Sequence, residues 1–266
     1  IDTDIDTDID TDTDTDTDAD TDAVCDTDCP DLRWISVPGG SFHMGSTEGQ
    51  IDETPVHEVT VPSFEMTQSE ITVTQYRACV RAWQCTNPDT AGVNSNWNQL
   101  GYENHPVNSV SWHQARVFCA WVAGRLSSEA EWEYAARSGG QDISYPWGDD
   151  KPNCNYAVMD NHSGNGCGTG KTMEVCSKPD GNTIHGICDL IGNVWEWVED
   201  DGHVDYTGAP IDGSAWIDSP RDMLRGVRGG SFYVFAEVLR AANRNNNEPN
   251  LRSDDLGFRC AKEAEP

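Results

Sequence analysis

The chain has 266 residues and a formal net charge of −29, with 17 Lys and Arg against 46 Asp and Glu. A surface this acidic repels nucleic-acid phosphates and anionic membranes, so we expect no nucleic-acid partner. No apolar run approaches the ~18 residues of a membrane-spanning helix, and we expect no membrane span. The acidity instead favours cations and basic partners.

Residues 1–31 are a low-complexity arm or linker with 14 Asp and no Lys or Arg, about half of the net charge. Asp occupies every even position of residues 2–22, and in an extended chain this period of two places all carboxylates on one face. One interpretation is a disordered tether, because high charge and low hydrophobicity do not offset the entropy lost on ordering. The alternatives are an arm ordered by divalent cations, by glycans on Thr, or by a neighbouring subunit. In the last case residues 1–22 self-associate as an added strand, head to tail, and form a filament.

The next elements are short. Alternation in residues 59–61 predicts a strand within residues 58–64, closed by Pro62. Residues 72–83 carry apolar side chains at spacings of three, four and three, which predicts a helix. These side chains are Val73, Tyr76, Val80 and Trp83.

Two further helices are predicted from capping residues. Ser111 is a favourable N-cap for a helix over residues 111–122, and Ser128 with Glu131 forms a capping-box pattern for residues 128–137. The apolar face of the first comprises Val117, Phe118, Trp121 and Val122. Residues 139–186 are rich in Gly, Asn, Asp and Pro and predict long irregular loops. We interpret the ten tryptophans as core packing for such a domain rather than as a ligand-binding aromatic platform.

Short motifs recur in a fixed order along the chain. They are residues 34–45 (WISVPGGSFHMG), 106–112 (PVNSVSW), 125–137 (RLSSEAEWEYAAR), 145–148 (YPWG), 192–197 (GNVWEW), 228–232 (RGGSF) and 256–260 (LGFRC). In this order and spacing they resemble the formylglycine-generating enzyme (sulfatase-modifying factor) family. The resemblance runs over residues 32–262. It implies one α+β domain over residues 32–266, with a C-type-lectin-like fold and much irregular loop structure, preceded by the acidic arm.

The segment after RGGSF departs from the family pattern. Members that oxidise a sulfatase cysteine to formylglycine hold copper with two cysteines shortly after this motif, whereas residues 232–259 contain no cysteine. The matching positions are Val234 and Leu239. Copper(I) needs soft sulfur ligands, which aliphatic carbon does not supply. We therefore expect no copper and no catalytic residues.

The resemblance implies a structural calcium ion at residues 189–196. Its ligands would be the side chains of Asp189 and Glu196 and the backbone carbonyls of Gly192 and Val194. Calcium takes several such oxygen ligands. The alternative is that Glu196 only forms an ion pair with a core arginine. A second family calcium begins near Asn155, but residues 161–172 diverge too far to assign its other ligands.

Ten cysteines favour disulfides and an oxidising compartment, so we expect an extracellular, cell-surface or periplasmic protein. There is no Cys-x-x-Cys pair, although Cys25 and Cys29 are close enough for a metal to stay an alternative. The resemblance implies a bridge from Cys119 to Cys260. Local pairing is expected for two further sets, and the connectivity of the second is open. These sets are Cys79 with Cys85, and Cys154, Cys167, Cys176 and Cys188.

The predicted function is a non-catalytic secreted or surface module, stabilised by calcium and disulfides, that binds a protein or glycan ligand or assembles through its arm. The alternative from another class is an oxidase of the formylglycine-generating type that acts on protein cysteine with altered metal ligands. A third hypothesis is a purely structural filament subunit.

Overall fold

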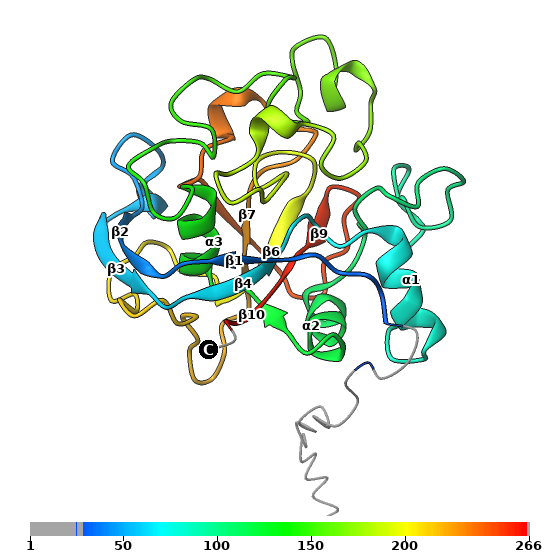
Figure 1. The fold of residues 1–266 in the computed structure, drawn as a ribbon, viewed down its shortest axis with the longest axis horizontal. Helices are drawn as coiled ribbons and strands as arrows, with labels where there is room; N and C mark the ends of the chain where they lie inside the picture. Colours follow the sequence, from blue (N-terminus) through cyan, green and yellow to red (C-terminus); the bar gives the residue numbers. More distant parts are fainter. Residues whose placement is uncertain (1–24, 26–28, 265–266) are drawn as a thin grey trace, which may run out of the picture.

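The computed structural model describes Cys25 and residues 29–264 (Figure 1). The acidic repeat of residues 1–22 therefore lies outside the described residues. Within the described part, the chain forms two four-stranded sheets, a two-stranded hairpin and three α-helices joined by long loops. The strands are β1 (Trp34–Val37), β2 (Gly40–Met44), β3 (His57–Val61), β4 (Phe64–Thr67), β5 (Arg125–Leu126), β6 (Trp195–Asp201), β7 (Arg225–Arg228), β8 (Arg244–Asn247), β9 (Leu256–Phe258) and β10 (Cys260–Glu263). The helices are α1 (Val73–Arg81), α2 (Trp112–Trp121) and α3 (Glu129–Ala136). This is the α+β fold with much irregular structure that the sequence predicts.

The first sheet joins the two ends of the domain. Its order is β1-β4-β10-β5, so the C-terminal strand β10 lies between β4 and β5. Ala261 pairs with Met66 on one side and with Arg125 on the other, both antiparallel. A disulfide from Cys119 of α2 to Cys260 anchors this strand, which is the pairing that the resemblance implied.

The second sheet positions the short motifs of the C-terminal half relative to each other. Its order is β8-β7-β6-β9, with β6 parallel to β9 and antiparallel to β7 (Figure 1). In this register Glu196 of β6 is paired with Arg228 of β7 and with Gly257 of β9. Three motifs that are far apart in the sequence therefore meet at one position of the sheet.

All three helices begin where the sequence predicts. Thr72, Ser111 and Ser128 are the N-caps, and each side chain accepts a hydrogen bond from the backbone of the third helical residue in a complete capping box. Such caps satisfy backbone N–H groups that a helix leaves without partners at its first turn. The predicted strand near residues 58–64 is β3, which pairs with β2.

Two side chains differ from the helical faces predicted for them. Trp83 is 93% exposed and has φ 62°, because α1 ends at Arg81 and the chain turns away from the core there. Val117 is 41% exposed, since it lies on the outer side of α2, whereas Phe118 and Trp121 are buried. Helical spacing alone does not tell where a helix stops or how wide its buried face is.

The loops between α3 and β6 contain only short 3-10 turns and isolated bridges. Two disulfides hold this region, Cys154–Cys167 and Cys176–Cys188, and two more link Cys79 with Cys85 and Cys25 with Cys29. Disulfide pairing of Cys25 with Cys29 leaves no thiolates there for the alternative metal. Five tryptophans are buried in the core: Trp97, Trp112, Trp121, Trp132 and Trp197.

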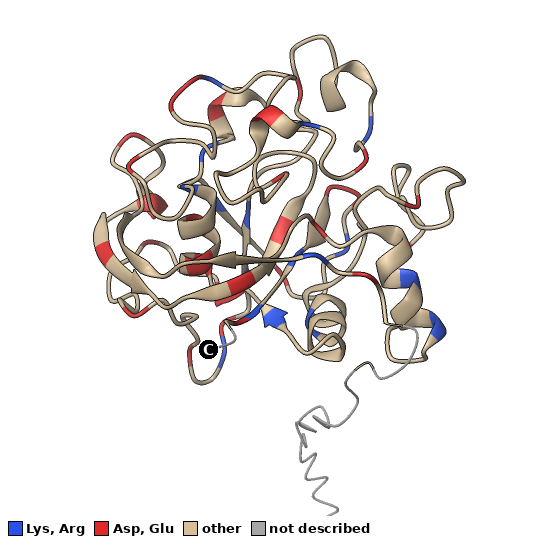
Figure 2. Ribbon diagram, in the orientation of Figure 1, with Lys and Arg blue, Asp and Glu red and all other residues tan. Residues whose placement is uncertain are grey.

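Acidic side chains are spread over strands and loops of the domain (Figure 2). The negative charge is thus not confined to the N-terminal arm. No helix in the described residues has the length and apolar character required to span a bilayer.

Candidate functional site

The segment that follows RGGSF leaves the end of β7 through two glycines in left-handed conformations. Gly229 has φ 94° and Gly230 has φ 75°. A Cβ atom on Gly229 would lie 2.9 Å from the carbonyl oxygen of Leu190 and 3.1 Å from the ring of Trp132. Glycine is therefore required here by both conformation and space.

Val234 and Leu239 come together in this segment. A Cβ atom on Gly230 would lie 2.4 Å from Leu239 Cδ2 and 3.0 Å from Val234 Cγ2, so both side chains border the same space. Leu239 is fully buried and Val234 packs against the same core cluster. At Val234 and Leu239, which the sequence analysis aligned without gaps to the copper cysteines, this chain presents only aliphatic carbon.

Polar side chains next to Val234 form a hydrogen-bond network. Ser231 Oγ donates to Asp255 Oδ2 at 3.1 Å, and Tyr233 donates its hydroxyl hydrogen to Asp254 Oδ2 at 3.2 Å. Asn94 Nδ2 donates to the Tyr233 hydroxyl at 2.7 Å. Burial is the main cause that raises the pKa of Tyr233, so its phenol stays protonated at neutral pH. These groups can form hydrogen bonds with a ligand but offer no soft metal donor.

The loop over residues 189–196 is wound by residues in left-handed conformations. Asp189, Gly192 and Asn193 have φ values of 56°, 87° and 62°. The Gly192 N–H donates to the carbonyl of Gly229 at 2.9 Å, which ties this loop to the RGGSF segment. A Cβ atom on Gly192 would lie 2.5 Å from the carbonyl oxygen of Val158, so no larger residue fits.

The structure places Glu196 in an ion pair. Arg259 donates through Nε to Glu196 Oε2 at 2.7 Å and through Nη2 to Oε1 at 2.6 Å, and Trp132 Nε1 donates to Oε2 at 2.8 Å. This is the arrangement that the sequence analysis set beside calcium as an alternative. The two roles are compatible at Oε1 alone, because Oε1 accepts one of these hydrogen bonds and keeps a second lone pair, whereas Oε2 already accepts two.

Asp189 lies at the other end of the loop and does not contact an arginine. Its Oδ2 accepts the backbone N–H of Cys176 at 2.5 Å, and the side chain is 7% exposed. The pKa of Asp189 is raised to about 6, mainly by burial, and the charge of Glu196 contributes to this rise while the hydrogen bond from Cys176 and the charge of Arg259 oppose it.

A third carboxylate, Glu70, was missed by the sequence analysis. It lies in the turn between β4 and α1, is fully buried, and accepts a hydrogen bond from Asn193 Nδ2 at 3.0 Å. Burial, followed by the charge of Asp189, raises the pKa of Glu70 well above its ordinary value. The only signal in the sequence was a single carboxylate directly before the apolar Ile71. We call Arg259, Glu196, Asp189 and Glu70 the Arg259 cluster.

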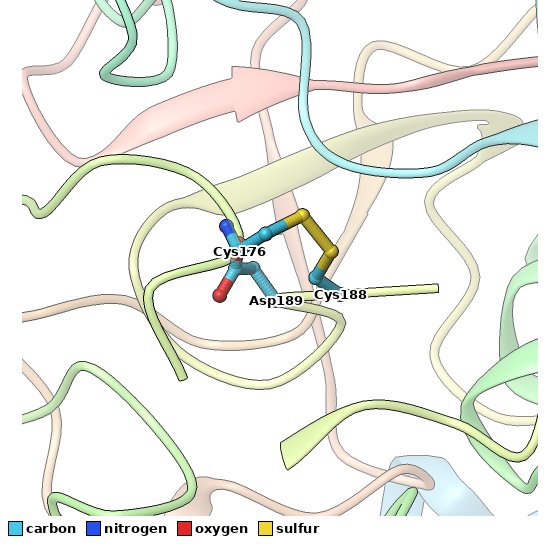
Figure 3. A group of neighbouring side chains, drawn as sticks. All are labelled: Cys176, Cys188 and Asp189. Atoms are coloured by element: carbon cyan, nitrogen blue, oxygen red, sulfur yellow. A yellow bond between two sulfur atoms is a disulfide. The ribbon is translucent and has the colours of Figure 1, made fainter. Parts of the chain in front are cut away.

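A potential metal-binding group includes Asp189. One ligand atom each from Cys176, Cys188 and Asp189 lies within 4.8 Å of the others. Figure 3 shows that the two sulfurs are bonded to each other, with the Asp189 carboxylate beside Cys176. Disulfide sulfurs are not thiolates, so the carboxylate is the metal donor that remains.

The residues at the loop have the ligand chemistry of a hard cation, although among the described residues neither Glu196 nor Glu70 belongs to the group whose donor atoms lie within 4.8 Å of one another. Carboxylates and backbone carbonyls are the ligands that calcium prefers, and Glu70 Oε2 is buried without a hydrogen-bond partner among the described residues. Asn155, expected at a second calcium site, is exposed, and its N–H donates to Asn153 Oδ1 at 2.9 Å.

Comparison with known proteins identifies the family. A model of the sulfatase-modifying factor enzyme 1-like domain matches residues 19–264. The chain belongs to this family. A formylglycine-generating enzyme of Streptomyces coelicolor is 30% identical, over 87% of this chain and 89% of the relative. An inactive C-alpha-formylglycine-generating enzyme 2 of Bos taurus is 31% identical, over 88% of this chain and 89% of the relative.

Other similar proteins carry the domain in different settings. The serine/threonine-protein kinase Pkn1 of Chlamydia trachomatis is 33% identical over 86% of this chain. The match spans only 38% of that relative's length. The solved structure of PvdO from Pseudomonas aeruginosa superposes with a TM-score of 0.75 at 32% identity, over 90% of this chain and 96% of that chain. The family and fold inferred from the motifs are thus confirmed.

Proposed function

We propose that this family domain is a non-catalytic binding or assembly module, secreted or exposed on a cell surface. The observation that carries the proposal is that the aliphatic side chains of Val234 and Leu239 both border the space beside Gly230. Copper(I) needs thiolate or thioether ligands, and none is present at these positions. One relative is named as an inactive C-alpha-formylglycine-generating enzyme 2 and another, about equally similar, as a formylglycine-generating enzyme. The sequence identity therefore does not distinguish the two functions, and the proposal rests on the residues at these positions.

Copper binding tests this proposal directly. We expect the wild-type chain, with its disulfides intact, to bind no copper(I) and to leave a peptide cysteine unoxidised. The double variant Val234→Cys/Leu239→Cys, kept reduced at these positions, should gain one equivalent of copper(I). Disulfides must stay intact, because ten liberated thiols would bind copper(I) without specificity. Stoichiometric copper and turnover in the wild type would instead support the oxidase with altered ligands.

The same proposal includes a structural calcium ion at residues 189–196. The acidic ligands support it, because two of the three buried carboxylates there lack an arginine partner. We expect chelation to lower the melting temperature of the wild type. Asp189→Ala should remove this difference, while Asp150→Ala, a change at an exposed carboxylate, should preserve it. An unchanged chelator effect in Asp189→Ala would reject the assignment.

Five disulfides support a secreted or periplasmic location, since such bonds persist in oxidising compartments. The proposed ligand is a protein or a glycan. Self-association through residues 1–22 would make the chain a filament subunit.

Particle mass from light scattering tests the arm. Deletion of residues 1–22 should convert assemblies to monomers. A control in which these residues are scrambled keeps the charge but loses the period of two, so it should also give monomers if strand pairing drives assembly. An unchanged particle mass after deletion would refute the role of the arm.

A further inference from the structure

Backbone hydrogen bonds on both sides of Glu70 fix the turn that carries it, and the residue itself is fully buried. The N–H of the next residue, Ile71, donates to the carbonyl of Phe258 at 2.9 Å, and the Ile71 carbonyl accepts from Val107 N–H at 2.7 Å. Gln68 accepts from the N–H of Cys188 at 2.8 Å through its carbonyl. Glu70 therefore cannot reach solvent unless the core opens.

The hydrogen bonds of Glu70 are incomplete. Oε1 accepts from Asn193 Nδ2 at 3.0 Å, whereas Oε2 is buried and has no hydrogen-bond partner among the described residues. An ionised carboxylate offers about four lone-pair sites. Asn193 lies between Gly192 and Val194, whose carbonyls belong to the proposed calcium loop, so Glu70 contacts this loop at its centre.

The guanidinium of Arg259 donates its hydrogen bonds to Glu196 and to backbone carbonyls. Its Nε and Nη2 bind Glu196, Nη2 also donates to the Cys188 carbonyl at 2.9 Å, and Nη1 donates to the carbonyls of Thr67 and Gln68 at 3.3 and 3.4 Å. No hydrogen bond from Arg259 goes to Glu70 or Asp189. The cluster therefore holds two carboxyl groups that accept no hydrogen bond from the guanidinium, although its charge lowers the pKa of both. The two carboxyl groups lie close enough for each to shift the pKa of the other.

A divalent cation would complete this arrangement. Burying an uncompensated carboxylate is costly, whereas an ion of charge +2 offsets two carboxylates and takes oxygen ligands from several elements. A proton shared by Glu70 and Asp189 would remove only one of the two charges. It would also leave part of the lone-pair sites of both groups empty.

We infer that Glu70 is a further ligand of the cation proposed at residues 189–196, so that the ion joins the β4–α1 turn to this loop. This inference rests on the proposed calcium site and extends it to a residue 119 positions before Asp189 in the chain. The ion would then cross-link the N-terminal and C-terminal halves of the domain, next to the RGGSF segment that Gly192 contacts.

The test is calcium affinity of the full chain with disulfides intact, measured by titration calorimetry for the wild type, Glu70→Gln and Asp200→Asn. Asp200 is a matched control: it is buried and its pKa is raised, but its two oxygens accept the backbone N–H groups of Glu129 and Trp216. We expect Glu70→Gln to weaken calcium binding about tenfold or more, because ligand charge sets calcium affinity. Asp200→Asn should leave the affinity unchanged.

Stability without calcium provides a second readout. Glu70→Gln removes a buried carboxyl group that is costly to ionise, so its melting temperature in chelator should equal or exceed that of the wild type. A merely structural Glu70 would give the opposite, a lower melting temperature together with an unchanged calcium affinity. If Glu70→Gln does not fold, Glu70→Asp retains the charge but withdraws the carboxylate, and wild-type affinity in that variant would overturn the inference.

The outcomes separate this inference from the calcium proposal. Equal affinity in Glu70→Gln and the wild type would remove Glu70 from the site and leave the calcium proposal standing. Absence of calcium binding by the wild type would overturn both.

Discussion

Two buried ionic clusters lie close together in this domain and balance their charges differently. The first, which we call the Arg228 cluster, contains Arg228, Arg244, Arg137, Glu129 and Glu133. Arg228 binds Glu129 at 3.0 Å and Glu133 at 2.7 Å, Arg244 binds Glu129 at 2.7 Å, and Arg137 binds Glu133 at 2.9 Å. In the Arg259 cluster, three carboxyl groups share one guanidinium, which binds only Glu196.

This difference in charge balance indicates which cluster has its carboxylates neutralised by arginines of the protein alone. Every carboxylate of the Arg228 cluster has an arginine partner, so it needs nothing from solution. The Arg259 cluster has the same burial and lacks this compensation, which is why it is the better candidate for a bound cation. Trp132 lies between the two: Arg228 stands 5.2 Å from its ring centroid, and its indole N–H donates to Glu196.

Removing the disulfide beside the Arg259 cluster should have the largest effect. Cys260 follows Arg259 directly, and its bond to Cys119 spans 141 positions. For a loop of this length the chain-entropy model gives about 5 kcal/mol, so Cys119→Ser/Cys260→Ser should lose about that much free energy of unfolding in a denaturant titration. The control Cys79→Ser/Cys85→Ser opens a separation of six and should lose only about 2–3 kcal/mol. Equal losses would contradict the loop-length account.

Removal of Arg228 from the Arg228 cluster should have the second-largest effect on stability. Arg228→Met leaves Glu133 and Glu129 with one arginine each, and we expect a loss of about 3–5 kcal/mol in the free energy of unfolding. Arg116→Met is the control, because its ion pair with Glu199 is 3.5 Å long and half exposed and should contribute less than about 1 kcal/mol. A small effect of Arg228→Met would show that the balanced cluster is not a stabilising unit.

Substitution of Trp132, which contacts both clusters, should reduce the free energy of unfolding by less than Arg228→Met does. Trp132→Phe keeps an aromatic ring near Arg228 but removes the hydrogen bond to Glu196, which should cost about 1–3 kcal/mol. A double-mutant cycle with Glu196→Gln measures the coupling of the two side chains. Additive effects would mean that the indole acts through packing alone.

The smallest expected effect is the change in the free energy of unfolding over a single pH unit. Burial, then the charge of Glu129, raises the pKa of Asp200 from 3.8 to about 8. A raised folded-state pKa gives stability that is complete below pH 3.8 and is lost as the pH rises towards about 8. Against Asp200→Asn, the wild type should therefore lose up to about 1.4 kcal/mol per pH unit between pH 5 and 8. Parallel pH profiles of the two proteins would refute the shift.

Local parts of the fold were predictable because they depend on neighbouring residues. Ser111 and Ser128 begin their helices as capping rules predict, and the helix after Thr72 begins where the apolar spacing predicts. Residues 139–186 are irregular as their Gly, Asn and Asp content indicates. The ends of the helices were less predictable, as the exposed Trp83 shows, because tertiary contacts decide where a helix stops.

Some residues of the candidate site were likewise predictable from the sequence, and others were not. The loop of Asp189 and Glu196 is continuous in sequence, so its motif could be found by reading along the chain. The replacement of two cysteines by Val234 and Leu239 was equally visible. The partner of Glu196 and the presence of Glu70 were not, because Arg259 and Glu70 come from opposite ends of the domain.

The sequence by itself determined the family, the absence of copper thiolates and the capped helices, since each depends on residue identity at short spacing. Only the tertiary structure decided which buried charges meet. The β4–α1 turn, the residue 189–196 loop and the strands β9 and β10 converge through long-range backbone pairing, and their distances in sequence carry no information about that contact. The balance of charge inside the core, and with it the proposed cation, follows from this convergence.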